Sequence, residues 1–367
     1  MNKKIRTVGV LTIVTIWAAL VAFSWFGPKT EISEAERRPL AQLPEITLES
    51  LLNGKFMSEF EDYSLDQFPL RDGFRQIKSL FHYYVLGQKD NNDIYIADGF
   101  AVKQEYPYNP ESVAHALDRF GYLYEKYLKA SGGDIFMTIV PDKGYYLGES
   151  SGHLTMDYEA MFTAFEENMT WAEFVDITGS LDGADYYRTD THWRQENLLD
   201  AAGKLCEALG VAAPKAEDYT AAALERPFYG VYYGQAALPM EPETMYVMES
   251  DLLNSCTVLD WESGKNNAVY DMSKLESKDL YDVFLSGSRS LLTIENPNAS
   301  TDRELIIFRD SFGSSIAPLL LQDYARVTLV DIRYMQSSML DQFIEFDGQE
   351  VLFLYGASMI NDSFTFK

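Results

Sequence analysis

One almost continuous apolar run, Asp134–Val140 (DIFMTIV), decides the fold class of this chain, and the turn residues Pro141-Asp142-Lys143 close it. A strand that is buried on both faces of a parallel sheet has this character. Three later runs share it: Glu304–Phe308, Val327–Asp331 and Val351–Tyr355. Helical patterns lie between these later runs, near 315–324 and 337–346. Strands that alternate with helices predict an α/β fold with a parallel sheet flanked by helices.

The segments around the first strand are more mixed. A helix is expected from about Pro110 to Ala130, because a Ser-Gly-Gly stop follows it. Ile94–Ile96 and Ala101–Val102 flank Asp98-Gly99 and predict a short hairpin. Residues 215–300 contain many tyrosines and turn residues, so we expect a loop-rich insertion there.

The N-terminus differs from the rest of the chain. The nineteen residues Val8–Phe26 are uncharged and apolar, and Lys3, Lys4 and Arg6 precede them. A helix of this length spans about 28 Å, close to the hydrocarbon thickness of a bilayer. Basic residues before the span favour a cytoplasmic N-terminus and place the rest of the chain outside the cell. The alternative is a cleaved signal peptide, whose apolar segment usually has only about 7–15 residues.

Residues 28–88 are expected to form a juxtamembrane spacer followed by amphipathic helices that pack back onto the main domain. Aromatic and aliphatic residues recur there at helical spacing: Phe56, Phe60, Tyr63, Phe74, Ile77 and Phe81. The simplest interpretation of this stripe is core packing. The predicted organisation is a stub and transmembrane anchor over 1–27, the spacer and helices over 28–88, and a main domain over 89–367.

Charge and composition exclude some classes of function. The formal net charge of −26 repels nucleic acid, so a nucleic-acid partner is not expected. The two cysteines, Cys206 and Cys256, could form a disulfide outside the cell, but their spacing does not establish it. The four histidines are scattered without zinc-type spacing: His82, His115, His153 and His192. We therefore expect no metal and no other cofactor.

The first candidate for chemistry is Ser311. It follows the strand that ends in Ile306-Ile307-Phe308, within the sequence Arg309-Asp310-Ser311-Phe312-Gly313. Ligands of open α/β sheets bind outside the carboxyl ends of the strands. Backbone amides of the following turn and the start of a helix could stabilise an oxyanion there. The structural alternative is that Asp310 or Ser311 only caps the helix.

The second candidate is the pair Asp190 and His192, within Thr189-Asp190-Thr191-His192-Trp193. Residues two apart in an extended segment point the same way, so both side chains could line one site. A nucleophilic serine needs a base to accept its proton and a carboxylate to orient that base. A histidine without such a role is the alternative.

These stretches together resemble the DHHW protein family, relatives of the alginate O-acetylation proteins with an SGNH-hydrolase-like domain. The resemblance covers most of the chain after the N-terminal span. Its landmarks occur in the family's order: Glu36–Leu40 with Leu43–Glu45, Phe60–Arg71, Asp98-Gly99, Val140–Lys143, Thr189–Trp193, Arg309–Gly313 and Val330–Tyr334. The departure is Thr191, which stands where the family name places a histidine. That position lies between Asp190 and His192, so no loss of chemistry is expected.

The resemblance implies a role for each catalytic candidate. Ser311 would be the nucleophile, His192 the general base and Asp190 the carboxylate that orients it. Gly287 and Asn361 are the positions to examine for further oxyanion donors. Five residues would bind substrate or be structural: Arg309, Trp193, Lys143, Arg333 and Tyr334.

The expected function is acyl-group chemistry at the cell surface. A membrane-anchored O-acetyltransferase or acetylesterase would act on a cell-surface polysaccharide or exopolysaccharide through an acetyl-enzyme. The resemblance implies that a membrane-bound O-acyltransferase supplies the acetyl group. The alternatives are a non-catalytic glycan-binding or assembly protein, or a scaffold, that keeps the fold.

Overall fold

The computed structural model describes residues 3–33, 35–88, 90–238 and 240–367, so Met1 and Asn2 of the predicted N-terminal stub lie outside the described residues. The chain divides into two compact units. An N-terminal unit contains residues 1–92 and also 231–240, and a main unit contains 93–230 and 241–367. The short insert 231–240 therefore belongs with the N-terminal segment, although it lies far away in the sequence.

The helices are α1 Lys3–Phe26, α2 Leu48–Leu52, α3 Lys55–Asp66, α4 Arg71–Leu80, α5 Pro110–Leu123, α6 Lys143–Leu147, α7 Tyr158–Asn168, α8 Leu199–Leu209, α9 Val231–Ala236, α10 Asp251–Ser255, α11 Gly313–Ile316 and α12 Ala357–Asn361. The strands are β1 Ile32–Ser33, β2 Arg38–Pro39, β3 Asp90–Asn91, β4 Ile94–Ala97, β5 Phe100–Lys103, β6 Ile135–Val140, β7 Glu173–Phe174, β8 Thr220–Ala223, β9 Tyr246–Glu249, β10 Thr257–Asp260, β11 Lys265–Asn267, β12 Leu291–Glu295, β13 Arg303–Arg309, β14 Tyr324–Val330 and β15 Glu350–Gly356.

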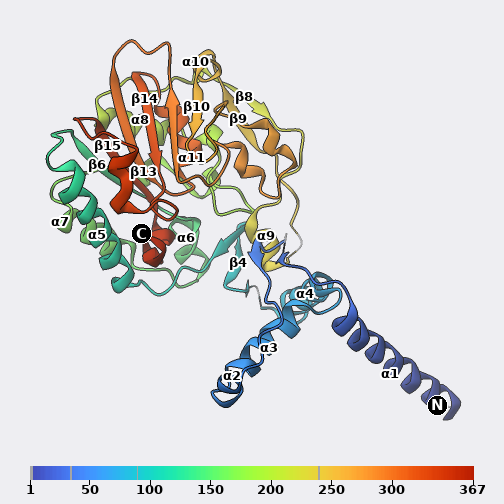
Figure 1. Ribbon diagram of the computed structural model, residues 1–367. Helices are drawn as coiled ribbons and strands as arrows, with labels where there is room; N and C mark the ends of the chain where they lie inside the picture. The colour runs from blue at the N-terminus through green and yellow to red at the C-terminus, as the bar shows by residue number, and fades with distance from the viewer. Residues whose placement is uncertain (1–2, 34, 89, 239) are drawn as a thin grey trace. The chain divides into compact units, whose positions relative to one another are not determined.

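The main sheet has, among the described residues, eight strands in the order β11-β10-β12-β14-β13-β15-β6-β7. The strands from β14 to β7 are parallel, whereas β11, β10 and β12 are antiparallel to their neighbours. Figure 1 shows β13, β14 and β15 together in the middle of the main unit. The predicted α/β fold is confirmed, with a mixed sheet that is mostly parallel.

The central strands are buried on both faces, as their apolar sequences predict. Along β13, Leu305 and Ile307 pack on one face with α8, while Ile306 and Phe308 pack on the other face with α5 and α7. Figure 1 shows α5 and α7 next to these strands. Side chains alternate between the faces of a strand, so an unbroken apolar run supplies both layers of the core at once.

Several local predictions hold. β4 and β5 form the expected hairpin, and its turn residues Asp98 and Gly99 have φ of 47° and 84°. Two left-handed residues in a two-residue turn are typical of the hairpin type that matches strand twist. The helix expected from Pro110 is α5, which continues as a π-helical turn at Tyr124–Leu128.

Other segments differ from expectation. Residues 215–300, expected to be loop-rich, contain β10, β11 and β12 of the main sheet. These strands are short, and β10 alternates exposed or half-exposed with buried positions, so they lack the long apolar run of a central strand. The helix expected near 315–324 is only α11 followed by a 3₁₀ turn at Ala317–Leu320. Pro318 explains the short helix, because it lacks the amide that an α-helix interior requires.

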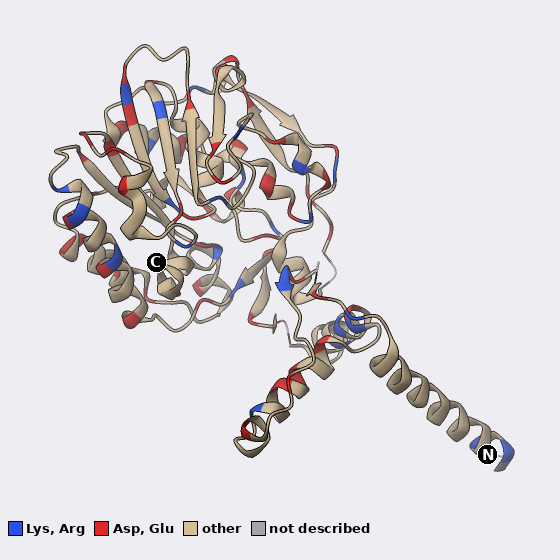
Figure 2. Cartoon of the chain, viewed as in Figure 1, with Lys and Arg blue, Asp and Glu red and all other residues tan. Residues whose placement is uncertain are grey.

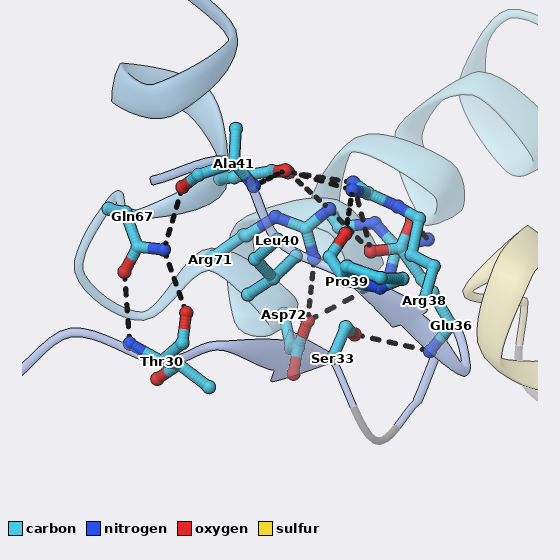
Figure 3. Close-up of polar contacts among 12 residues, drawn as sticks. Thr30, Ser33, Glu36, Arg38, Pro39, Leu40, Ala41, Gln67, Arg71 and Asp72 are labelled. Carbon is cyan, nitrogen blue, oxygen red and sulfur yellow. Dashed lines mark hydrogen bonds and ion pairs between the residues drawn. The ribbon is translucent and has the colours of Figure 1, made fainter. Parts of the chain in front are cut away.

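The N-terminal unit contains α1, which is long and apolar enough to cross a bilayer. A membrane anchor and a signal sequence share this property. After α1, the chain brings two of the family-like stretches together, since Arg38 makes a double hydrogen bond to Asp66 at 2.7 and 2.8 Å. This arginine lowers the pKa of Asp66 to about 2. Gln67 binds the backbone N–H and carbonyl of Thr30 in the same cluster (Figure 3).

Cys206 and Cys256 are both free and buried. Burial raises the pKa of the Cys206 thiol to about 12 and that of Cys256 to about 11. Both side chains pack in the core on the α8 face of the sheet. They act there as small apolar residues, and the disulfide left open by the sequence is not formed.

Candidate active site

Ser311 lies two residues after the carboxyl end of β13, in the turn that leads to α11. Asp310 shapes this turn, because its Oδ1 accepts from the Phe312 amide at 2.9 Å and its Oδ2 from the Gly356 amide at 2.7 Å. Burial raises the pKa of the Asp310 carboxyl. Gly356 ends the neighbouring strand β15, so Asp310 fixes the serine turn to the edge of the sheet.

A continuous hydrogen-bonded series joins Asp190, His192 and Ser311. The Asp190 Oδ1 lies 2.6 Å from His192 Nδ1, and His192 Nε2 lies 2.8 Å from Ser311 Oγ. A carboxylate only accepts hydrogen bonds, so Nδ1 carries the ring proton and Nε2 presents its lone pair to the serine hydroxyl. The same Asp190 oxygen also accepts from the His192 backbone amide at 3.1 Å, which holds the pair in one geometry.

Aromatic rings hold His192 in place. Tyr281 stacks on the imidazole with ring centroids 3.8 Å apart, and Phe312 meets it edge-on at 5.4 Å. Tyr281 is itself positioned by a hydrogen bond of 2.7 Å between its hydroxyl and Ser315 Oγ. The imidazole is buried while Ser311 is half-exposed, so a small molecule can reach the hydroxyl without displacing His192.

Glu243 holds the loop that carries Asp190 and His192. Its buried carboxylate accepts hydrogen bonds from the amides of Arg188 at 2.8 Å and Thr189 at 2.9 Å, and from the Thr189 hydroxyl at 2.9 Å. Gly230 closes the other side: its amide donates to Thr189 Oγ1, and a Cβ at this position would lie 2.4 Å from Asp190 Cβ. Only glycine allows the backbone to approach this closely.

Gln195 connects the histidine loop to the serine helix. Its Nε2 donates to the Ser315 carbonyl at 2.7 Å, and its Oε1 accepts from the Met248 amide and the Tyr270 hydroxyl. The side chain is fully buried, and both ends of its amide are used. It therefore fixes the distance between the segment that carries His192 and the segment that carries Ser311.

Two of the residues considered for substrate binding are buried supports. Trp193 is fully buried, and its indole N–H donates to Ser315 Oγ at 2.7 Å, so its ring packs beside the site with its faces covered by protein. Lys143 Nζ donates to the Tyr187 carbonyl at 2.9 Å. Burial lowers the pKa of the Lys143 ammonium to about 7. Trp193 and Lys143 therefore both stabilise the Asp190–His192 loop from within the protein.

The arginines after the sheet strands surround Asp331. Arg309 is fully buried, with Nη1 donating to the Asp310 carbonyl at 3.2 Å and lying 4.0 Å from Asp331 Oδ2. Arg333 makes a double hydrogen bond to Asp331 at 2.9 and 2.6 Å. Tyr334 is half-exposed beneath the Arg333 guanidinium. Among the predicted substrate contacts, Arg333 and Tyr334 alone keep exposed surface.

The groups considered as oxyanion donors make hydrogen bonds to other parts of the protein. Asn361 accepts from the Asn109 amide and donates to the Pro107 carbonyl. The Gly287 amide donates to the Phe284 carbonyl. In the serine turn, the Phe312 amide donates to Asp310 Oδ1 and the Gly313 amide to the Asp310 carbonyl. The Ser314 amide donates to the Ser311 carbonyl. The amides expected to follow the serine are thus engaged, and Phe312 is the residue that caps α11, without a side-chain bond.

The described residues contain no group of three or more His, Cys, Asp or Glu side chains arranged to bind a metal ion. Three supporting residues escaped the sequence analysis: Glu243, Gln195 and Tyr281. No local pattern marks them, because each is separated from its partners by at least about thirty positions of sequence. A search for polar residues at the ends of the predicted strands would not have found them either.

Solved structures share this fold at low sequence identity. A DHHW family protein from Eubacterium siraeum is 20% identical with a TM-score of 0.58, over 74% of this chain and 96% of that chain. Bacillus cereus PatB1 with a sulfonyl adduct is 15% identical with a TM-score of 0.59, over 73% and 95%. PatB1 without the adduct is 16% identical with a TM-score of 0.58, over 73% of this chain and 96% of that chain. No curated protein sequence matches the chain.

The family comparison matches the part of the sequence that contains the candidate active site. The model of the DHHW protein family matches residues 157–330. This range includes Asp190, His192 and Ser311, together with the supports Glu243 and Gln195. The chain is therefore similar to the DHHW protein family over the segment that holds the candidate site, and it shares the fold of a solved member of that family.

Proposed function

We propose that the chain is a serine-dependent O-acetyltransferase or acetylesterase that acts on a cell-surface polysaccharide or exopolysaccharide through an acetyl-enzyme. The observation that carries the proposal is the hydrogen-bonded series Asp190–His192–Ser311 at the carboxyl edge of the sheet. Each contact has the length and order that nucleophilic catalysis by serine requires. The resemblance to the alginate O-acetylation proteins supports the choice of acetyl groups and polysaccharide.

The geometry supports a two-step acyl transfer. Ser311 Oγ attacks the acetyl carbonyl, and its proton passes to His192 Nε2 while Asp190 stabilises the imidazolium. The tetrahedral oxyanion is held by the Ser311 amide. Its collapse expels the leaving alkoxide, which takes the proton from Nε2, and leaves acetyl-Ser311. A sugar hydroxyl or water then gives its proton to Nε2 and attacks the acetyl carbonyl. Collapse of this second tetrahedral intermediate breaks the bond to Ser311 Oγ, which takes the proton back from Nε2, and releases the acetylated sugar or acetate.

Transfer and hydrolysis differ only in the acceptor that reaches acetyl-Ser311. Arg333 and Tyr334 follow a strand of the same sheet edge and keep exposed surface, so they are the candidates to bind a sugar acceptor. In this proposal α1 is a membrane anchor that keeps the enzyme outside the cell. A membrane-bound O-acyltransferase would then supply the acetyl group.

The direct test uses an acetyl ester and a serine-reactive probe. Wild type should release acetate and be labelled at Ser311, whereas Ser311→Ala should lose both activities. Ser338→Ala is the matched control, because Ser338 is an exposed serine of the same unit. If Ser311→Ala releases acetate at the wild-type rate and the probe does not label Ser311, the chain is a non-catalytic member that keeps the fold.

The substrate class requires a test in cells. Cells that express wild type or Ser311→Ala should differ in the O-acetyl content of one surface polysaccharide. A lower content in the mutant would show a transferase, and a higher content would show an esterase. Equal acetylation of every polysaccharide would contradict the proposed substrate class, even if the ester assay succeeds.

A further inference from the structure

Helix α4 has its polar side turned toward the protein. Arg75 Nη2 donates to the carbonyls of Gly234 at 3.1 Å and Gln235 at 2.9 Å, and the Ser79 hydroxyl donates to the Ala236 carbonyl at 2.9 Å. Arg71 forms an ion pair with Glu36 on the same side (Figure 3). All these partners belong to the N-terminal unit. The polar side of α4, which most amphipathic helices expose to water, is therefore covered by the unit.

The opposite side of α4 is apolar and exposed. Leu70 is 77% exposed, Phe74 45%, Ile77 64% and Phe81 50%, and Tyr84 follows one turn later at 68%. These residues are spaced by three or four, so they form a single stripe along α4 and the π-helical turn Phe81–Val85. Because the polar side is already fixed to the unit, the helix cannot turn to bury the stripe against it. Something outside the unit must cover it.

The apolar helix α1 indicates what that cover is. Trp25, near its end, contacts the ring of Phe60 on α3 at 6.2 Å, and Phe60 stacks with Phe56 at 5.8 Å. Thr30 is then bound by Gln67, three residues before the stripe begins at Leu70. These contacts join the end of the candidate span to the start of α4. The apolar surface of the unit thus continues from α1 toward α4.

The charge of α4 favours a lipid surface over a second copy of this acidic chain. Residues 71–80 carry Arg71, Arg75 and Lys78 against Asp72, a net charge of 3 − 1 = +2, in a chain of net charge −26. Figure 2 shows basic residues gathered on α4. Lys78 is exposed. Arg71 and Arg75 pair with Glu36 inside the unit, so Lys78 is the exposed cation of α4 that can meet anionic headgroups beside the apolar stripe.

We propose that α4 and its π-helical turn form a second membrane contact, lying in the headgroup region of the leaflet from which α1 emerges. Phe74, Ile77 and Phe81 would enter the boundary of the acyl chains, and Lys78 would meet anionic headgroups. The contact differs from α1, because it lies along the surface and does not cross the bilayer. It is independent of the proposed acetyl chemistry.

The test places a fluorescent label on each side of the helix. Ile77→Cys and Gln76→Cys, both at exposed positions, are each labelled with bimane in the full chain. The chain is reconstituted in vesicles of phosphatidylcholine and phosphatidylglycerol. The two native thiols are buried with raised pKa values, so they react slowly at neutral pH. Gln76 lies beside Ile77 but outside the stripe, so it controls for simple proximity to the membrane.

The label at 77 should be quenched at least several-fold more than the label at 76 by a doxyl lipid, and less by iodide in the water. Equal quenching of the two labels by iodide would show that the stripe faces water and would overturn the proposal. Protection of position 77 from both quenchers would also overturn it, because protein would then cover the stripe. Acetyl-ester hydrolysis by the same samples is measured separately, so the two proposals fail independently.

Discussion

Replacement of Glu243 by alanine should disable the loop that carries Asp190 and His192 without replacing a residue of the proposed triad. The carboxylate accepts from two backbone amides and one hydroxyl, all within two residues of Asp190. Alanine leaves these donors without their acceptor. The Thr189 hydroxyl still accepts from the Gly230 amide, and the ion pairs of Glu243 with Arg188 at 3.6 Å and Arg194 at 3.7 Å are long, so the two amides of Arg188 and Thr189 carry most of the cost.

The magnitude follows from these two amides. An amide left without its partner in the interior costs about 1–3 kcal/mol, so the pair costs about 2–6 kcal/mol if the loop does not move. If the loop moves toward water instead, His192 leaves Ser311, and a shift of about 1 Å can reduce the rate roughly 100-fold. Glu243→Gln keeps one acceptor oxygen and should lie between wild type and alanine.

The assay measures the rate at which a serine-reactive probe labels Ser311, together with the thermal midpoint of unfolding. Glu243→Ala should lower both, and the exposed neighbour Glu241→Ala should change neither. Labelling is measured well below the midpoint, so that only folded protein reacts. A lower midpoint with a wild-type labelling rate would refute the positioning role and leave Glu243 as a purely structural residue.

Three further predictions concern the supports of the site. Tyr281→Ala should slow the labelling of Ser311 because it removes the ring stacked on His192, whereas Tyr281→Phe keeps the ring and should label nearly normally; equal rates for the two variants would contradict this. Trp193→Phe removes the hydrogen bond to Ser315 and should lower the free energy of unfolding by about 1 kcal/mol in a denaturant titration. Lys143 has a pKa of about 7 in the folded protein against 10.5 ordinarily, so between these values the unfolded chain binds more protons and the free energy of unfolding rises with pH. Lys143→Met should lose this rise when unfolding is compared at pH 7 and pH 9.5.

The parts of the fold that could be predicted are those with strong local signals. The apolar runs of β6, β13 and β15 identify central strands because both of their faces are buried. The strands β10 and β11 could not be identified in the same way. β11 is the edge strand and β10 lies next to it, and both have polar, exposed positions, so their sequences resemble loops.

The site was predictable to the extent that its residues lie at element ends or two positions apart. Ser311 follows a strand, and Asp190 and His192 lie on one short loop. His192 and Ser311, which contact each other, are 119 residues apart in the sequence. From the sequence, only the resemblance to a family connected the two stretches. The substrate role considered for Trp193 could not be judged from sequence, because an indole beside a site and an indole within it have the same neighbours.

The supports were missed for a physical reason that applies to both units. Glu243, Lys143 and Arg75 are charged groups with hydrogen bonds to backbone amides or carbonyls, and Glu243 and Arg75 also form ion pairs, with Arg194 at 3.7 Å and with Glu36 at 3.2 Å. An ion pair requires a second charged residue, which leaves a mark in the sequence, whereas a backbone partner can belong to any residue. Through their backbone partners, such charges stabilise one path of the chain. These backbone contacts are therefore invisible to pattern analysis, both at the loop that carries His192 and at the helix that presents its apolar stripe.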